Sequence, residues 1–553
     1  MLAVLSGGCR NQDDSGFGAR AAQIVPVEPC LPLSGTAWVP NIAGVDSSHH
    51  DATVSVTRQV VTTTGPLTGF AQPAPASQEV SVTIDMSQDL GAFGSLTLVA
   101  EPINFPSNRS GSAYPILVSL SDGTNELVHL ARTGAGNDCA QSGYFLWDGS
   151  DVSVNSNCKV SAPSAYANMD QWTGHQFSPF GFASVNTFPT CNWAGGSGTA
   201  LLPSCAFNSN FFVGGKLRSG VNYTAKYVLL ASNYITVGSG STAGLKVTAV
   251  KKRSNRAGVG GAIDLNVILV GQKNVQHSRT EQGKRNLDTL FGLVNDYLSQ
   301  ATSGIGIGAV HVYEWGCADG GEVFATASLN ESTDANYVGK MLATGSSMVS
   351  ASSEGKALNV FLVSKISRIS ENSLLEVGGL SGGLGGLPIN GLAASGLAFA
   401  SGEKLGSFNR LCSTTPCPLT EQDPAFYNMG STIAHEIGHY LGLNHPSEDD
   451  GTVHDAVLDT PVCTKTEPLG NESLLTAHSC YLDDNVVLGQ KCAAVCPGYD
   501  PGSGVFCETM PECQFNHLMW WFAKKFSQSL GRGDGNILSS HSGAVINYSP
   551  FVQ

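Results

Sequence analysis

Residues 431–446 read STIAHEIGHYLGLNHP, and this stretch decides how the second half of the chain is interpreted. Its apolar residues recur at helical spacing, so a helix is predicted here. Two histidines of the helix, His435 and His439, are four residues apart. Positions i and i+4 lie one above the other on one helix face, so both imidazoles can reach one metal ion. Glu436 lies next to the first histidine, near the same ion without being a ligand.

The end of the stretch supplies a third nitrogen. Gly442 lets the chain leave the helix, because glycine adopts left-handed dihedral angles at little cost, and the turn brings in His445. The sequence therefore predicts a Zn²⁺ site formed by His435, His439 and His445. Three protein ligands leave a fourth position for water, which is typical of a catalytic zinc. Glu436 is the predicted general base for a zinc-bound water.

The pattern His-Glu-x-x-His-x-x-Gly-x-x-His resembles that of the metzincin zinc peptidases. Downstream, residues 455–461 read DAVLDTP, which is similar to the D-x-V-x-D-T-P segment of the pappalysin and cytophagalysin branch. That branch also has a cysteine-rich stretch before its methionine turn, and a cysteine-rich insertion spans residues 463–513 here. The resemblance covers residues 260–553. It implies an α+β zinc endopeptidase domain whose protein or peptide substrates lie extended along the edge strand before the zinc helix.

The resemblance also implies a role for the segment Asn516-His517-Leu518-Met519. Met519 would form the methionine turn, an apolar floor under the zinc. Relatives often carry tyrosine two residues after this methionine, whereas this chain has Trp521, which cannot ligate zinc. Assistance by a tyrosine from that position is therefore not expected.

A second metal is suggested by the same downstream segment. Asp455, Asp459 and Thr460 are candidate Ca²⁺ ligands, because the family's loop here resembles a calcium-binding one and oxygen atoms suit that hard cation. The alternative is that Asp459-Thr460-Pro461 only caps a turn.

The first half of the chain has a different texture. Residues 1–45 are interpreted as a signal or lipid-anchor remnant followed by a tether, because residues 10–45 are rich in Gly, Ser, Asp and Pro. Residues 46–255 contain short β-type runs between turn signals, which predict an all-β, sandwich-like domain. The runs include Val54–Thr57, Val80–Ile84, Leu96–Val99, Ile116–Val118 and Tyr227–Leu230. No catalytic constellation occurs in this region, so a binding or spacer module is favoured over a second enzyme.

After residues 254–261 the pattern changes to alternating strands and helices, typical of an open sheet with helices packed against it. The predicted strands are Ile263–Val270, Ile305–Tyr313 and Leu358–Val363, and the predicted helices are Asn286–Ser299 and Asn336–Leu342. A glycine-rich stretch, Gly378–Gly396, is predicted to be a loop near the active site, and Ala398–Ala400 is predicted to be an edge strand. The chain as a whole is thus predicted to be multidomain.

Charge and cysteine content limit the partners and the compartment. The net charge of −15, without a basic stripe, argues against nucleic acid as a partner. Most of the 15 cysteines are not in CxxC pairs, which favours disulfides in an oxidising compartment. Cys9 follows Leu5-Ser6-Gly7-Gly8, which looks like the tail of a bacterial lipoprotein signal. Lipidation of Cys9 would attach the protein to a membrane, and the other 14 cysteines could then form seven bridges.

That signal is short and no Lys or Arg precedes it, so an ordinary free cysteine is the alternative. Either way we expect an extracytoplasmic protein: a cell-surface or outer-membrane lipoprotein, or a secreted one. Two other functions remain open. One is a zinc hydrolase that acts on something other than peptides, and the other is a non-catalytic surface binding or adhesion lipoprotein that retains a metal site.

Overall fold

The structure is a computed structural model of the 553-residue chain. It describes residues 51–64, 74–75, 79–103, 113–129, 143–144, 173–178, 181–186, 217–231, 242–256, 258–300, 303–330, 334–370, 373–383, 385–401, 424–443, 519, 538 and 540–553. Among these residues, no helix combines the length and the apolar character that crossing a bilayer would require.

Two antiparallel sheets form what we call the two-sheet region, residues 52–254. The first sheet has the order β1-β11-β4-β8-β9, with bounds Ala52–Thr64, Thr242–Ser254, Ser95–Ile103, Thr173–Ser178 and Gly181–Asn186. The second has the order β3-β10-β5-β6, with bounds Glu79–Met86, Val221–Ala231, Ala113–Ser121 and Glu126–His129. A further pair joins β2 (Ala74–Pro75) to β7 (Gly143–Tyr144).

One apolar core lies between the two main sheets. Along β4, Leu96, Leu98 and Ala100 are fully buried in it, and along β11 Leu245 and Val247 contribute in the same way. Alternate residues of a strand point to opposite faces, so this period of two is what places them together. The other face of β4 and β11 is also buried, because Val99 and Val250 belong to a second cluster. The first sheet is therefore covered on both sides at β4 and β11.

A mixed sheet organises what we call the mixed-sheet region, residues 261–553. Its order is β13-β12-β15-β19-β18, with bounds Ile305–Trp315, Gly261–Val270, Ala357–Val363, Leu397–Ala400 and Gly379–Ser381. The first four strands are parallel, and β18 pairs antiparallel with β19. The strands predicted at Ile263–Val270, Ile305–Tyr313 and Leu358–Val363 are confirmed by β12, β13 and β15.

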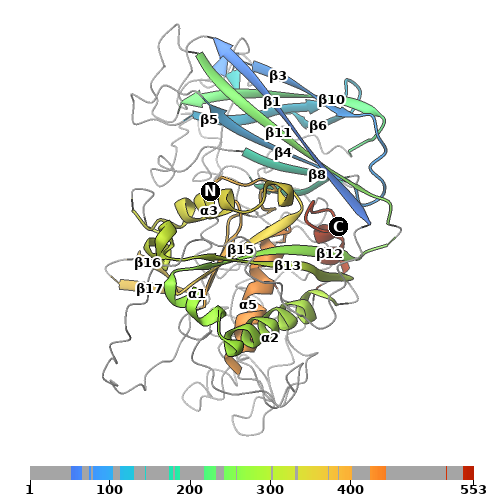
Figure 1. The fold of residues 1–553 in the computed structure, drawn as a ribbon. Coiled ribbons are helices and arrows are strands. Elements are labelled where there is room, and N and C mark those ends of the chain that lie inside the picture. Colours follow the sequence, from blue (N-terminus) through green and yellow to red (C-terminus); the bar gives the residue numbers. More distant parts are fainter. Residues whose placement is uncertain are drawn as a thin grey trace, which may run out of the picture.

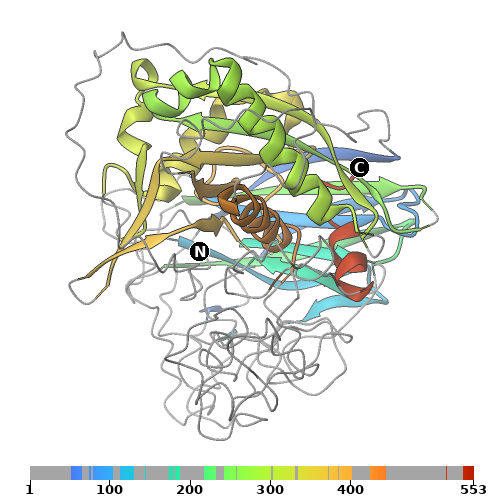
Figure 2. The ribbon, with the colours of Figure 1, turned by 90° about the horizontal axis from the view of Figure 1, so that it is seen from below.

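Helices cover both faces of this sheet. The helices are α1 (Gln272–Ser278), α2 (Glu281–Leu298), α3 (Val338–Met348), α5 (Pro424–Tyr440) and α8 (Ser540–Asn547). The helices α2 and α5 share one core with a face of the sheet, and α3 packs against the opposite face. Figure 1 shows the two-sheet region above the mixed sheet and α2 below it. Seen from below, α2 and α5 lie in front of the sheet (Figure 2).

The position of the sheet edge corrects one prediction. Ala398–Ala400 does lie in a strand, β19, but that strand is inside the sheet between β15 and β18. The edge strand is β18, which lies within the glycine-rich stretch that was predicted to be only a loop. The reason is that the chain folds back: β18 precedes β19 and pairs with its outer side. A short sheet of β14 (Thr326–Ser328), β16 (Lys365–Ser370) and β17 (Ser373–Val377) was not predicted at all.

The two regions contact each other through an apolar cluster. We call residues 382–383 and 385–396, which connect β18 to β19, the glycine-rich loop. Leu387, Ile389 and Ala394 of this loop pack against Val99 and Val250 of the two-sheet region. The glycine-rich loop is therefore held between the two regions.

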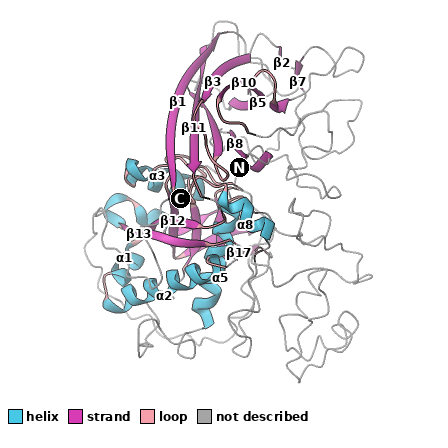
Figure 3. Cartoon of the chain, turned by 90° about the vertical axis from the view of Figure 1, so that its right-hand side faces the viewer, coloured by secondary structure: helices cyan, strands magenta, loops and turns pink. Residues whose placement is uncertain are grey.

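Polar contacts reinforce this interface. The buried amino group of Lys252 on β11 donates to the carbonyl oxygens of Asn547 (2.6 Å) and Ser549 (3.0 Å), at the carboxyl end of α8. Burial lowers the pKa of Lys252 well below its usual value, and Arg256 adds to the effect. The side chain of Gln176 on β8 donates to the carbonyl of Tyr548 at 2.6 Å. Figure 3 shows α8 beside β8, at the junction of the two regions.

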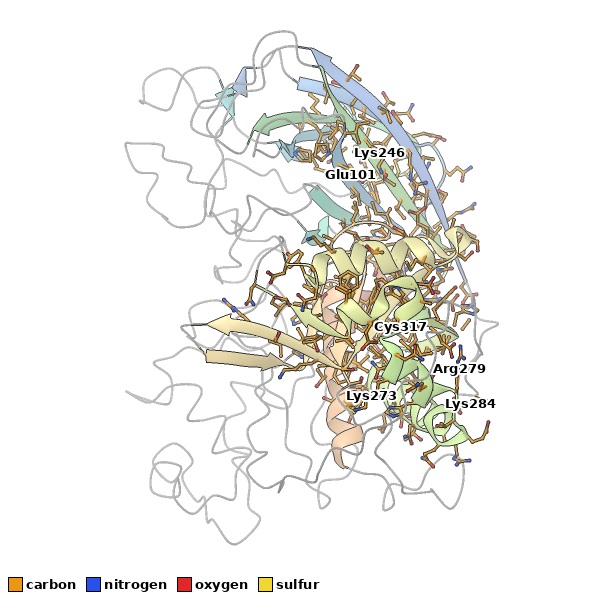
Figure 4. The ribbon with its side chains drawn as sticks, turned by 60° about the vertical axis from the view of Figure 1, so that its left-hand side comes forward. Glu101, Lys246, Lys273, Arg279, Lys284 and Cys317 are labelled. Atoms are coloured by element: carbon orange, nitrogen blue, oxygen red, sulfur yellow. The ribbon has the colours of Figure 1, made fainter. Side chains whose placement is uncertain are left out.

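Ion pairs lie on the strands of the first sheet as well. Lys246 of β11 pairs with Glu101 of β4 at 2.8 Å, and Figure 4 shows these two side chains on neighbouring strands. Arg58 of β1 pairs with Glu354, whose other carboxylate oxygen accepts from the backbone N–H of Asn390 at 3.2 Å. Through Glu354, this second pair links the two-sheet region to the glycine-rich loop.

Candidate metal centre

The helix that carries the predicted zinc motif, α5, is anchored by its apolar face. Ile433, Ala434 and Ile437 are fully buried in the core shared with α2 and the sheet. Gly430 allows a close approach of the two helices, because a Cβ atom there would lie 2.9 Å from the Cβ of Leu293 on α2. This packing fixes how the opposite, polar face of α5 is presented.

The first two predicted ligands lie together on that polar face. The rings of His435 and His439 have centroids 4.6 Å apart and are arranged edge to face. Both side chains are buried, with 7% and 3% of their surface exposed. The structure thus places the rings of two predicted zinc ligands next to each other, as their spacing on one helix face requires.

A backbone carbonyl defines the tautomer of His439. Its Nδ1 lies 2.7 Å from the carbonyl oxygen of Leu443. A carbonyl oxygen can only accept, so Nδ1 carries the proton, and Nε2 then carries the lone pair with which the ring would bind a metal. Metal-binding histidines commonly have such a partner for the second ring nitrogen, because it orients the ring and raises its basicity.

The end of α5 has the backbone geometry that the sequence predicts for Gly442. Its φ of 111° lies in the region that favours glycine. The N–H of Gly442 donates to the carbonyl of His439 (3.0 Å), and the N–H of Leu443 donates to the carbonyl of Gly438 (2.9 Å). These two bonds form a Schellman motif, which ends the helix and redirects the chain.

Several predicted site residues lie outside the described part of the chain. They are the third ligand His445, the calcium candidates Asp455, Asp459 and Thr460, the residue Trp521 and the cysteines Cys9 and Cys463 to Cys513. Within the described residues, no group of three His, Cys, Asp or Glu side chains is placed to hold a metal ion. The two described histidines suit zinc in their chemistry, because neutral imidazoles are typical zinc ligands, and the ring of His439 is in addition oriented by the carbonyl of Leu443.

Glu436 lies in a buried position against the edge strand β18. The backbone N–H of Ser381 donates to its carboxyl group. Burial raises the pKa of Glu436 to about 8, and the bond from Ser381 counteracts only part of that rise. A carboxyl group with a pKa near neutrality is suited to both accepting and donating a proton.

The glycine-rich loop closes the carboxyl end of α5, a role that the sequence analysis did not foresee. The backbone N–H groups of Gly385 and Gly386 donate to the carbonyls of His439 (3.0 Å) and Tyr440 (2.6 Å). These carbonyls belong to the last turn of the helix, where the regular donor four residues ahead is missing, and the carbonyl of His439 accepts from Gly385 as well as from Gly442. Tyr440 is buried, and its hydroxyl lies 2.9 Å from the carbonyl of Leu387. The only sequence signal for this contact was the glycine content of the loop.

A row of amide side chains holds the same loop from the sheet side. Asn266 on β12 donates to Asn359 on β15 at 2.9 Å, and Asn359 donates to Asn390 in the loop at 2.9 Å. Asn359 also donates to the carbonyl of Ser395 at 3.1 Å. Buried amides bonded in series fix relative positions well, because breaking one bond leaves a buried polar atom unsatisfied.

Met519 packs against the helix between the two histidine turns. Its side chain is fully buried, and a Cβ atom at Gly438 would overlap its sulfur atom. Glycine at position 438 therefore provides the space that Met519 fills. The residues around Met519 lie outside the described part of the chain, so the conformation of the predicted methionine turn is not described here.

Comparison with known proteins does not assign this chain to a family. No protein-family model matches it, and no curated protein matches it.

Proposed function

We propose that this protein is a zinc-dependent endopeptidase that hydrolyses peptide bonds of extracellular proteins. The observation that carries the proposal is the polar face of α5. There the ring centroids of His435 and His439 lie 4.6 Å apart, and Glu436, the next residue after His435, is buried. In this proposal His445 supplies the third ligand, and Met519 forms the floor of the site. Asp455, Asp459 and Thr460 remain candidates for a separate Ca²⁺ site.

The chain's own groups would share the chemistry as follows. A bound zinc ion supplies Lewis-acid polarisation of the scissile carbonyl and makes a water molecule more acidic. Glu436 accepts a proton from the attacking water and then passes it to the departing amine. The rise in the pKa of Glu436 strengthens its carboxylate as a proton acceptor, which favours the first of these transfers.

The edge strand is the place for the substrate in this proposal. β18 ends the mixed sheet and lies directly beside Glu436. An extended peptide can add to such an edge through main-chain hydrogen bonds, which places a peptide bond next to the catalytic groups. This contact would be largely independent of the substrate's side chains.

The compartment is proposed from the cysteines. Cys317 is disulfide-bonded, and disulfides persist in oxidising compartments. We therefore place the protein outside the cytoplasm, either secreted or attached to a membrane through a lipidated Cys9.

The test compares wild type with Glu436→Gln. We expect wild type to cleave casein, to lose that activity with a chelator and to regain it with added Zn²⁺. Glu436→Gln should retain zinc, because the substituted group is not a ligand, and lose about 10²- to 10⁴-fold in turnover. Zinc content by mass spectrometry and cleavage of a fluorogenic peptide library measure the two effects separately.

A matched control is Glu281→Gln, which makes the same change on the exposed start of α2 and should leave activity unchanged. Equal turnover in Glu436→Gln and wild type would remove Glu436 from the reaction. Bound zinc without cleavage of any peptide would instead favour the binding or adhesion function, or a hydrolase for another substrate.

A further inference from the structure

Gly379, the first residue of the edge strand β18, occupies a position where glycine is not required by the backbone. Its φ is not among the positive values that favour glycine in this structure. Glycine inside a strand lowers stability, because it has the most conformational freedom to lose and no side chain to pack. The usual reason for such a glycine is the close approach of another group.

The group that approaches Gly379 is the side chain of Glu436. A Cβ atom at position 379 would lie 2.8 Å from Cγ of Glu436 and 3.0 Å from its Oε1. It would also lie 3.1 Å from Cγ2 of Thr432, one helical turn before Glu436 on α5. A contact of 2.8 Å between carbon atoms is well inside the optimal separation, so one of the two groups would have to move.

The backbone of β18 provides the complementary attraction. Two residues after Gly379, the N–H of Ser381 donates to the carboxyl group of Glu436. The strand thus offers space for Glu436 at Gly379 and a hydrogen-bond donor for it at Ser381. Glu436 fits between these two features on a strand that is itself fixed by its pairing with β19.

We propose that Gly379 is a positioning residue for the general base: its missing side chain lets the edge strand lie against Glu436 and fixes where that carboxyl group points. This inference rests on the proposed function for its catalytic consequence, but the contact between positions 379 and 436 does not. The displacement of a catalytic group by about 1 Å can cost on the order of a hundredfold in rate.

The catalytic test is Gly379→Ala in the full chain. We expect kcat to fall about 10- to 100-fold, with KM and zinc affinity within threefold of wild type. If Gly379 had only a structural role, Gly379→Ala would lower the amount of folded protein. The folded molecules would then keep the wild-type kcat and KM. The matched control is Gly292→Ala on α2, where a Cβ atom meets nothing within 4 Å, and it should leave kcat unchanged.

A second measurement tests the contact between positions 379 and 436 through protein stability, without an activity assay. Pushing Glu436 from its rotamer should raise the unfolding equilibrium constant of Gly379→Ala about 2- to 12-fold in urea titrations of the zinc-free protein. In the Glu436→Ala background, which lacks the crowded atoms, the same substitution should have no such effect. A cost that persists there, or an unchanged kcat, overturns the proposal.

The Thr432→Ser background separates the two neighbours of position 379. It removes Cγ2 of Thr432 and leaves Glu436 intact. The cost of Gly379→Ala should remain in this background, and its disappearance would show that the glycine accommodates Thr432 instead. If wild type cleaves no peptide, the proposed function fails, while the coupling between positions 379 and 436 still decides whether the contact exists.

Discussion

The two faces of helix α5 are held in place by different kinds of contact. The apolar face, with Ile433 and Ile437, lies in a core built from α2 and the mixed sheet. The polar face, with His435, His439 and Glu436, meets backbone groups: the carbonyl of Leu443 and the N–H of Ser381. Dispersion and burial tolerate small shifts, whereas hydrogen bonds to single atoms do not.

The apolar face of α5 therefore contributes mainly to stability, and the polar face carries the proposed chemistry. Substitutions on the apolar face should change the free energy of unfolding and leave the chemistry of the remaining folded molecules unchanged. Substitutions on the polar face should impair the chemistry, and replacing Glu436 should also raise stability at high pH, because a buried carboxyl group costs stability when it is ionised. The following predictions test this division.

The largest effect is expected from the pH dependence of stability in the zinc-free protein. The folded chain holds the proton of Glu436 up to about pH 8, whereas the unfolded chain releases it near the ordinary pKa of 4.5. Between these values the folded state binds more protons, so stability falls as pH rises. The loss should be on the order of 4 kcal/mol between pH 4.5 and pH 8.

Urea unfolding of wild type and Glu436→Gln at a series of pH values measures this effect. Glu436→Gln should be the more stable protein at pH 8 and should lack this part of the slope. Glu101, whose pKa burial also raises, is present in both proteins, so its contribution cancels in the difference. Identical slopes for the two proteins would mean that Glu436 is well solvated or paired in the zinc-free state.

Next in size is the truncation of the apolar face. Ile433→Ala should destabilise the protein by about 2–5 kcal/mol, because Ile433 is fully buried and a cavity would remain. Zinc affinity and kcat of the folded fraction should stay at wild-type values. The graded control is Ile433→Val, with a cost of about 0.5–1.5 kcal/mol. A large fall in kcat for either variant would show that the two faces are not separable.

The smallest of the three effects concerns Gly442, at the carboxyl end of α5. Gly442→Ala places a side chain at a φ of 111°, which should cost about 1–3 kcal/mol. Gly442 lies three residues before the proposed third ligand His445, so zinc affinity is expected to fall as well. The control is Gly258→Ala, at an open position without positive φ. Unchanged zinc binding in Gly442→Ala would argue against His445 as the third ligand.

Local elements of this fold could be predicted because their signals are local. The helix around His435 and His439 follows from residue spacing, and β12, β13 and β15 follow from runs of apolar residues. Helix α2 begins five residues before the predicted Asn286, at Glu281, where the side chain of Thr280 accepts from the N–H of Gly283. Such a cap is a sequence signal that the apolar spacing alone did not use.

Contacts between distant backbone segments could not be predicted in this way. Which strand lies at the sheet edge depends on the fold-back of β18 onto β19, and no local pattern encodes the partner of a strand. The bonds from Gly385 and Gly386 to the end of α5 are made by backbone groups, which every residue possesses. The contact of Gly379 with Glu436 joins residues far apart in the chain, so it appeared only in the structure.

The cluster between the glycine-rich loop and the two-sheet region has a practical consequence for producing the protein. A fragment starting at residue 260 would expose Leu387, Ile389 and Ala394 to water, and a fragment ending at residue 255 would expose Val99 and Val250. Exposed apolar patches promote aggregation. Neither half should therefore be well behaved in solution when expressed alone, and co-expression of both halves is the more promising way to obtain soluble material from a split gene.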